Sequence, residues 1–436
     1  MNLKRLFKDS ALYTAMNVLS KGISIILLPI YTYFLSPAQF GLVDYFAAIG
    51  AIVAVTISLE VSQAIVRFLP DLKKNNADIS PLISASLLSL ILSFSVFVVP
   101  VLIFAEHISF GLFDTYDYSH LVRLSACLYC LHGFVHIFNS ILVALLKSKK
   151  SIGFSLINTV FNASATYLLL VNTELRVEAL LLGQMIGAAA SLICYYPVVL
   201  GSVNFTFERS ALNQIYKFSL PLIPSSVGVI LAMFTDRLMI KEFLDLESLG
   251  VYGIALRVAS IMTLITTGFR TALTPIIYSS HEARDTKPKI IKLFYLYLLM
   301  AFFILCGVLF FQEMIVLYLS SKEYMGATEV VGILCTTIFI SNCYIFFPGL
   351  SLAQKTASIS IVNVLGMIVN VVLNFVFIPI YGILAAATAT LISALFTFVV
   401  HFTLSQRHYA LPITSSRLLT TLMVLLMSVF TLQKVL

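Results

Sequence analysis

Long apolar runs separated by short polar segments dominate this chain. A membrane-spanning helix needs about 20 apolar residues, and a first group of twelve runs meets that length. These runs lie at 11–35, 41–69, 80–104, 118–146, 151–171, 177–200, 214–241, 248–278, 289–318, 326–353, 357–378 and 382–404. The pattern predicts an all-α polytopic membrane protein with about 12 transmembrane helices. The count rises to 13 if a shorter last run, 416–434, crosses the membrane instead of lying in the interface.

Composition supports the same class. Of the 436 residues, 60% are hydrophobic and only 11% are charged, whereas a soluble domain has roughly 25% charged residues. The chain cannot cover a water-facing surface, so lipid must be its solvent. The net charge of +7 comes from Lys and Arg scattered in short loops, without an aromatic-basic platform, and does not indicate nucleic-acid binding.

The polar loops also predict an orientation. Most Lys and Arg residues fall in alternate loops, on the side that would hold the N-terminus, so we place the N-terminus in the cytoplasm. The opening MNLKRLFKDS followed by an apolar run resembles a signal peptide. The run is longer than a typical signal core and lacks a clear cleavage site, which favours a retained first helix.

Two sequence matches indicate an internal repeat. The stretch FLSPAQFGL at 34–42 recurs as FLDLESLGV at 243–251, an offset of 209, and KSIGFSLIN at 150–158 matches KTASISIVN at 355–363, an offset of 205. Six helices in each half give two parallel six-helix bundles with a cargo site between them. We predict one bundle over 1–200 and the second over 201–405. Residues 406–436 then form a cytoplasmic segment with the extra C-terminal run.

Four cations lie inside apolar runs: Lys21, Arg237, Arg257 and Arg270. A bare charge at a helix centre costs at least ~2.5–3.5 kcal/mol. Such residues either line a water-filled cavity, where they can bind phosphate oxygens of an anionic cargo, or extend to the interface. Extension to the interface is strained for Lys21 and Arg257, which favours cavity lining for these two, whereas Arg237 and Arg270 fit both explanations.

Three acids also lie within the runs: Asp44, Glu60 and Asp236. One interpretation is a carboxylate that couples transport to protons or sodium. The other is charge pairing, for example of Glu60 with Lys21, or of Asp236 with an arginine of the run 248–278. We favour pairing, because the cations outnumber the acids.

The sequence gives little sign of a metal site or of a catalytic site. His132 and His136 share a helix face near Cys127 and Cys130, but no further acid or histidine converges on them, so we predict no metal site. No phosphate-binding loop, nucleophile elbow or zincin helix occurs. We therefore predict a protein that is not an enzyme and needs no cofactor.

Three segments carry a resemblance to a known family. They are LSPAQFGLVDYF at 35–46, AIVRFLPD at 64–71 and the stretch 217–258, with its Pro-containing start, Asp-Arg pair and Gly-x-Tyr. The chain resembles the polysaccharide-export flippases of the MOP superfamily, the Wzx-type O-antigen transporters, over residues 1 to 405.

The resemblance implies a multi-pass protein of the bacterial inner membrane. Such a protein moves an undecaprenyl-pyrophosphate-linked oligosaccharide from the cytoplasmic to the periplasmic leaflet by alternating access. The sugar and pyrophosphate would occupy a cationic central cavity. The implied partners are this anionic lipid-linked oligosaccharide, the membrane lipids, and other polysaccharide-assembly proteins.

Three alternatives remain open at this point. A multidrug exporter of the same superfamily would use intramembrane acids, whereas the first helix has Lys21 and no acid. A membrane-embedded oligosaccharide polymerase or ligase would need a sizeable periplasmic loop, and the longest outer loop, 105–117, is short. A membrane scaffold would tolerate substitution of Lys21 or Arg257.

Overall fold

The computed structural model describes residues 22–23, 25–201, 203–280 and 285–413. Every regular element in these ranges is a helix, and they contain no strand, which confirms the predicted all-α class. The predicted thirteenth run, 416–434, lies outside the described residues, as does the first part of the 11–35 run.

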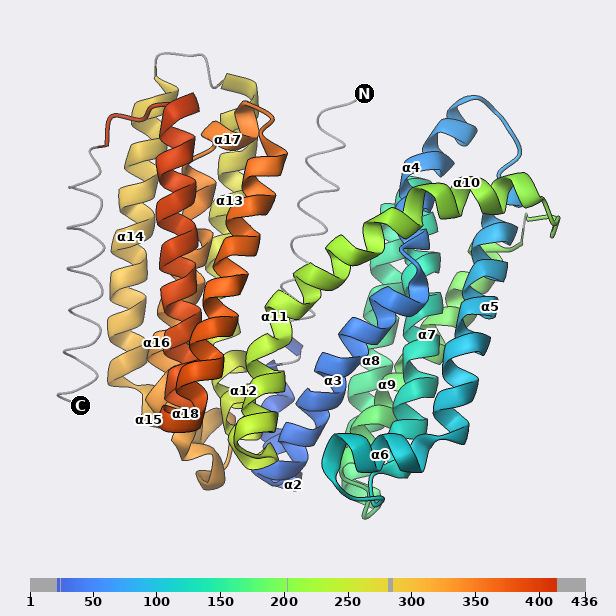
Figure 1. The fold of residues 1–436 in the computed structure, drawn as a ribbon, viewed down its shortest axis with the longest axis horizontal. Helices are drawn as coiled ribbons and strands as arrows, with labels where there is room; N and C mark the ends of the chain where they lie inside the picture. Colours follow the sequence, from blue (N-terminus) through green and yellow to red (C-terminus); the bar gives the residue numbers. More distant parts are fainter. Residues whose placement is uncertain (1–21, 24, 202, 281–284, 414–436) are drawn as a thin grey trace. The chain divides into compact units, whose positions relative to one another are not determined.

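Two compact units divide the described chain. Unit 1 comprises 22–35 and 42–234, and unit 2 comprises 36–41 and 235–413. Helices α3 and α11 therefore each begin in one unit and end in the other. The helices from α2 to α11 (Figure 1) are α2 (Leu28–Phe34), α3 (Pro37–Ser58), α4 (Val61–Lys74), α5 (Ser80–Ile103), α6 (Ala105–Phe113), α7 (Ser119–Ala144), α8 (Ser148–Asn172), α9 (Val177–Val199), α10 (Arg209–Ser219), η1 (Leu220–Leu222) and α11 (Ile223–Phe243).

Unit 2 continues with the second group of helices. These are α12 (Leu246–Ser260), α13 (Met262–Ser280), α14 (Thr286–Phe310), α15 (Gln312–Leu319), η2 (Lys322–Ala327), α16 (Thr328–Asn342), η3 (Cys343–Phe346), α17 (Gly349–Leu352) and α18 (Thr356–His408). The predicted bundle boundary at residues 200–201 concerns the sequence repeat and stays a prediction. The contact-based division falls later, at 234–235, because α10 packs into the core of unit 1.

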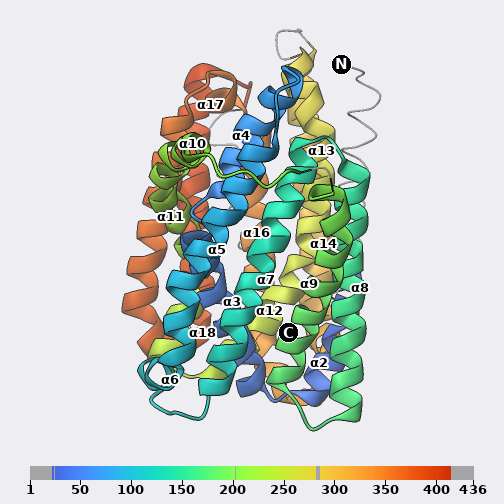
Figure 2. The same cartoon turned by 90° about the vertical axis from the view of Figure 1, so that its right-hand side faces the viewer.

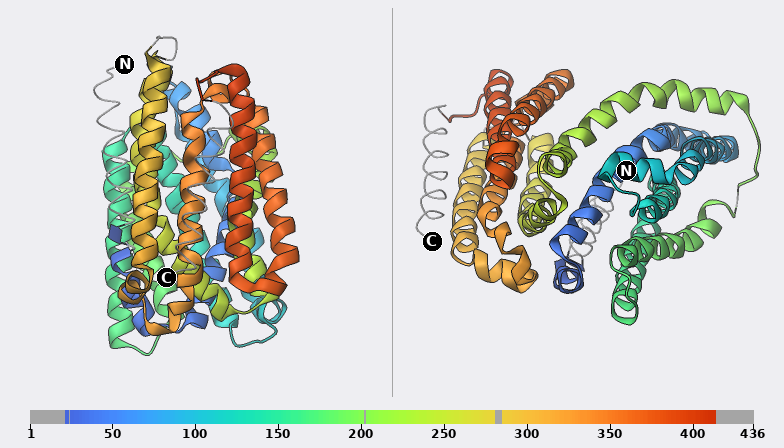
Figure 3. Two further views of the ribbon diagram at one scale, coloured as in Figure 1. Left: turned by 90° about the vertical axis from the view of Figure 1, so that its left-hand side faces the viewer. Right: turned by 60° about the horizontal axis from the view of Figure 1, so that its bottom comes forward.

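Ten helical segments in the described residues are long and apolar enough to cross a membrane. One of them, α18, contains two of the predicted spans. Its helix is interrupted at Gly382, whose φ of 62° lies in the left-handed region that glycine tolerates. The arms 356–381 and 383–408, coloured orange to red, run side by side in Figure 3. About twelve membrane helices are consistent with this arrangement.

The predicted span 41–69 is broken into α3 and α4, which corrects a single-helix expectation. Leu59 and Glu60, between the two helices, both have left-handed backbones, with φ of 49° and 53°. Such angles are uncommon for residues with a side chain. The break frees the Ile57 carbonyl oxygen, which accepts a hydrogen bond of 2.6 Å from Ser93 Oγ. A tertiary contact thus supports the interruption.

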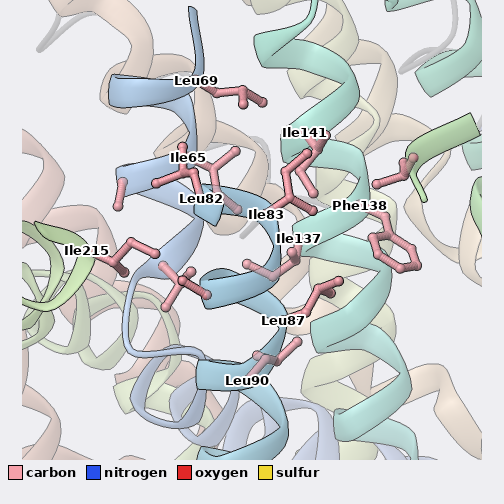
Figure 4. Close-up of a cluster of buried hydrophobic side chains, with 14 of the residues drawn as sticks. Ile65, Leu69, Leu82, Ile83, Leu87, Leu90, Ile137, Phe138, Ile141 and Ile215 are labelled. Carbon is pink, nitrogen blue, oxygen red and sulfur yellow. The ribbon is translucent and has the colours of Figure 1, made fainter. Parts of the chain in front are cut away.

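The core of unit 1 is an apolar cluster shared by α4, α5, α7 and α10. Ile65, Ile83, Ile137 and Ile215, one from each helix, are fully buried in it (Figure 4). Helices α7, α8 and α9 run alongside one another in Figure 2. Because serines on α5 are buried with these side chains, small hydroxyls here allow close helix packing.

In unit 2, the start of α3 crosses α12 with almost no space between the backbones. A methyl carbon added at Gly41 would overlap the Leu246 carbonyl oxygen and lie 2.9 Å from the Gly250 nitrogen. One added at Gly250 would overlap the Pro37 carbonyl oxygen and lie 3.0 Å from the Gly41 nitrogen. The pairs Gly41 and Gly250, and Pro37 and Leu246, are both 209 residues apart. The contact is therefore reciprocal between equivalent positions of the repeat.

A matched pair of turns fixes the register of the repeat farther along. Leu146 and Gln354 are both left-handed. The next residues, Lys147 and Lys355, each donate a hydrogen bond from the backbone N–H to the carbonyl oxygen five residues earlier. Each of these lysines directly precedes a helix, α8 or α18. These equivalent positions are 208 residues apart. The sequence match at an offset of 205 is therefore wrong by three residues, because it aligned common residue types rather than the turn.

Candidate functional site

A buried hydrogen-bonded chain of polar side chains lies within unit 2. The Asp236 carboxylate accepts hydrogen bonds from the Arg237 backbone N–H (2.8 Å) and from the Tyr252 hydroxyl (2.8 Å). The Tyr252 hydroxyl also interacts with the Thr390 hydroxyl. Asp236 is buried and Tyr252 has no exposed surface. An acid so far from water requires compensating polar groups, and helices α11, α12 and α18 supply them.

Two asparagines extend this chain along the first arm of α18. Asn370 Nδ2 donates to Thr390 Oγ1 (3.3 Å), and Asn374 Nδ2 donates to Asn370 Oδ1 (3.0 Å). Asn374 is fully buried, and within the described part of the chain its Oδ1 accepts no hydrogen bond. Most buried acceptors in proteins have a partner. We define Asp236, Tyr252, Asn370, Asn374 and Thr390 as the unit 2 polar cluster.

The local sequence explains how these side chains come together. Asn370 and Asn374 are four residues apart, so they share one face of the helix. The interruption at Gly382 turns α18 back on itself and sets Thr390, on the second arm, beside that face. Sequence reasoning identified Asp236 from its charge but missed the neutral members. The pair of asparagines one helical turn apart in an apolar run could have identified this cluster from the sequence.

The unit 2 polar cluster offers oxygen ligands and one negative charge. Carboxylate, amide and hydroxyl oxygens suit hard cations or protons rather than soft transition metals. Among the described residues, no three His, Cys, Asp or Glu side chains lie close enough to hold a metal ion together. The predicted pair His132 and His136 on α7 thus gains no third ligand of these types within that range.

Unit 1 contains a neutral counterpart of the cluster. Thr166 Oγ1 donates to Asn162 Oδ1 (3.2 Å) one turn away on α8. At the repeat offset of 208, Asn162 and Thr166 correspond to Asn370 and Asn374. At the offset of 209, Leu27 corresponds to Asp236. The polar pair one helical turn apart is therefore present in both repeats, whereas the acid at this position occurs only in the second.

The structure describes three of the four predicted intramembrane cations, all in unit 2. Arg257 is half-buried, and its guanidinium carbon is 4.3 Å from the centre of the Phe40 ring. The Arg257 Nη1 donates a hydrogen bond to the Gly253 carbonyl oxygen (3.2 Å). Half-buried Arg237 acts electrostatically on Tyr252, beside the polar cluster. Arg270 is exposed on α13. Lys21 lies outside the described residues.

The two remaining predicted acids belong to unit 1, where both are buried. Asp44 lies on α3, and Glu60 occupies the break between α3 and α4. The Glu60 carboxylate acts electrostatically on the His136 ring of α7. The predicted pairing of Glu60 with Lys21 stays a prediction, because Lys21 is outside the described residues.

Comparison with known proteins agrees with this architecture. A family model described as polysaccharide biosynthesis protein matches residues 6–281, and a second, MatE, matches 221–376. The chain is 25% identical over 240 residues to the probable low-salt glycan biosynthesis flippase Agl15 of Haloferax volcanii. That match covers 53% of this chain and half of the flippase's own length.

Solved structures show the same fold. The lipid II flippase MurJ in an inward closed conformation superposes with a TM-score of 0.72 at 14% identity, covering 97% of this chain and 91% of that one. An inward-facing multidrug resistance transporter of the MATE family, in the MOP superfamily, gives 0.70 at 15% identity, covering 92% and 96%. These likenesses establish the fold.

The first family model covers more than half of the chain, and the predicted resemblance to the flippases of this superfamily is confirmed. The multi-pass helices and the MurJ-like fold agree with that match. The chain belongs to the polysaccharide biosynthesis protein family of MOP superfamily membrane transporters.

Proposed function

We propose that this protein flips an undecaprenyl-pyrophosphate-linked oligosaccharide, such as an O-antigen repeat unit, from the cytoplasmic to the periplasmic leaflet. It would act in a bacterial inner membrane with its N-terminus in the cytoplasm. The family match and the glycan flippase relative support a lipid-linked glycan as cargo. A pyrophosphate is anionic, so the cargo also explains why arginines are retained in apolar helices.

The observation that carries the proposal is the setting of Arg257. Its guanidinium stacks over Phe40 and donates to a backbone oxygen, so part of its charge is stabilised by the protein before any cargo binds. A guanidinium has five N–H donors in a planar fork that matches phosphate oxygens. Arg257 is half-buried on α12.

We further propose that transport is coupled to a cation bound at the unit 2 polar cluster. Asp236 supplies a charge, and Asn374 Oδ1 supplies a buried acceptor that the described residues leave unused. A proton would neutralise Asp236, whereas a sodium ion bound among the oxygens of the cluster could also be coordinated by Asn374 Oδ1. Transport that rises with sodium at fixed pH would identify sodium, and transport that follows pH alone would identify the proton.

A multidrug exporter is the second candidate. The MatE model and the MATE fold likeness favour it, and such a protein would use Asp236 for its cargo. Efflux of a cationic dye from cells that express the protein separates the two functions. We expect no efflux above that of cells with an empty vector.

Complementation tests the flippase function. In a bacterium that lacks its own O-antigen flippase, using the host whose glycan this protein serves, we expect wild type to restore surface polysaccharide. Loss of a charge-assisted hydrogen bond of roughly 1.5–3 kcal/mol should lower the rate about tenfold or more. We therefore expect Lys21→Ala, Arg237→Ala and Arg257→Ala to lose most surface polysaccharide at matched expression.

Arg67→Ala is the matched control. Arg67 is an exposed arginine of α4 that pairs with Asp71 at 2.7 Å, and such exposed pairs contribute about 0–1 kcal/mol. Its surface polysaccharide should stay near the wild-type level. If Arg257→Ala and Arg67→Ala behave alike, Arg257 is a structural residue. If wild type restores nothing in the matched host, the flippase function itself is wrong.

A further inference from the structure

The segment that joins the two repeats is fixed along a membrane helix. The backbone N–H of Asn204 donates to Ser80 Oγ and that of Thr206 to Ser84 Oγ, both at 3.3 Å. Ser80 and Ser84 are one helical turn apart on α5, about 6 Å at 1.5 Å per residue. Two residues reach that far only when nearly extended. We call residues 203–208 the strap.

The strap lies beside the first turns of a helix that is long and apolar enough to cross a membrane. Its two serine partners belong to the first turns of the α5 span, Ser80–Ile103. Phe205 and Phe207 are 67% and 69% exposed, so the described residues leave most of both rings uncovered. Two exposed phenylalanines within three residues form an apolar surface that water does not favour. At the edge of a span, that surface meets the boundary between headgroups and acyl chains.

Helix α10 follows the strap and has two distinct faces. Its buried positions Ala211, Ile215 and Ser219 recur every four residues and pack against α4 and α5. The opposite side carries exposed polar and charged residues, listed as Arg209, Asn213, Gln214 and Lys217. Within unit 1, α10 runs across the ends of α4 and α5 rather than along them (Figure 1). Helix α10 therefore packs its apolar face on α4 and α5 and directs its charged face outward.

The charged residues around this surface indicate which class of lipid would contact it. Arg209 and Lys217 are exposed on α10, and Lys73 and Lys74 end the neighbouring helix α4. The strap contributes one acid, Glu208, which accepts a hydrogen bond from Ser210. Lys and Arg near a membrane surface attract anionic headgroups, by about 1 kcal/mol each.

We propose that the strap and α10 form a membrane-interface anchor for anionic lipid. Phe205 and Phe207 enter the acyl boundary, and Arg209 and Lys217 contact lipid phosphates. The anchor holds the link between the two repeats at the membrane surface and on unit 1. This inference concerns the surrounding bilayer and does not depend on the proposed function.

The chain has no tryptophan, so one introduced tryptophan reports on its own surroundings. In liposomes, we expect the indole of Phe207→Trp to be quenched about twofold more by lipids brominated near the headgroup than by lipids brominated near the chain end. Phe303→Trp, at a 64% exposed position within the α14 span, should show the reverse order. Asn213→Trp, on the polar face of α10, should instead be quenched by aqueous acrylamide.

Anionic preference has its own readout. Quenching of Phe207→Trp should be stronger with brominated phosphatidylglycerol than with brominated phosphatidylcholine. Adding both Arg209→Gln and Lys217→Gln to this variant should remove the difference between the two lipids. Circular dichroism and gel filtration establish that each variant is folded. If acrylamide quenches Phe207→Trp and brominated lipids do not, the strap faces water. If neither quencher acts, protein covers it, and either result overturns the anchor.

Discussion

Replacing Gly250 with alanine is expected to destabilise the protein by about 3 kcal/mol, the upper end of the usual cost of overpacking. The added methyl would overlap the Pro37 carbonyl oxygen, and backbone atoms cannot rotate away as a side chain can. The start of α3 and α12 would have to separate. Gly41→Ala meets the Leu246 carbonyl oxygen in the same way and should cost a similar amount.

Thermal melting in detergent, followed by circular dichroism, measures this effect. A loss of this size should lower the apparent Tm by roughly 5 °C or more. The double variant should cost less than the sum of the two single changes, because one separation of the helices relieves both clashes.

Gly307→Ala is the control for these substitutions. Gly307 lies within α14, and its added methyl would meet no atom within 4 Å. Alanine favours a helix over glycine by up to about 1 kcal/mol, so this variant should melt at or above the wild-type temperature. If Gly250→Ala melts like Gly307→Ala, the tight crossing between α3 and α12 is not formed in the protein.

Asp236→Asn is expected to leave the protein folded and to remove most of its transport. The amide still accepts a hydrogen bond from the Tyr252 hydroxyl, but it has no charge with which to bind a cation. We expect flipping in proteoliposomes to fall about tenfold or more, as expected when a charged ligand worth at least 1.4 kcal/mol is lost. Asn374→Leu removes the unused acceptor and should weaken cation binding while retaining the acid.

Ligand-induced stabilisation gives a readout that needs no glycan. A cation that binds the folded state at about a hundred times its Kd stabilises it by about 2.7 kcal/mol. The wild-type Tm should therefore rise with sodium, or change with pH if the cation is a proton, and Asp236→Asn should lose that response. If neither sodium nor pH shifts the wild-type Tm, the cluster is a structural network.

Asp245→Asn is the matched control for Asp236. Asp245 is an exposed acid of the same unit whose side chain accepts from the Ser248 backbone N–H (2.7 Å) at the start of α12. Asparagine serves as well as aspartate at such a helix start. Both transport and the cation response should survive, so a loss in Asp236→Asn would not reflect a general loss of negative charge.

The sequence predicted the helix bounds well wherever the thickness of the hydrocarbon core sets the length of a helix. The runs 80–104 and 177–200 correspond closely to α5 and α9, because a span must be apolar over its whole length. The break at Leu59 and Glu60 was missed, since neither glycine nor proline marks it. Its support is the Ser93 hydroxyl, which lies more than thirty residues away and was invisible to local reasoning.

The candidate site was only partly predictable for a related reason. A charge in an apolar run is conspicuous, so Asp236 and Arg257 could be named from sequence. Tyr252 and Thr390 are ordinary residues for membrane helices, and only the fold of α18 places Thr390 near Asn370. The role of each neutral side chain depends on convergence between helices, which residue type alone does not reveal.

The difference between the two repeats bears on ancestry and on stoichiometry. A duplicated ancestor would have given both copies the same ladder, yet Leu27 stands where the second copy has Asp236. At this position only the second copy has a charge, so the coupling proposed above would bind one cation there for each cargo molecule. Leu27→Asp would place an acid at the equivalent position of the first copy, where Val43 and Leu182 stand in place of Tyr252 and Thr390.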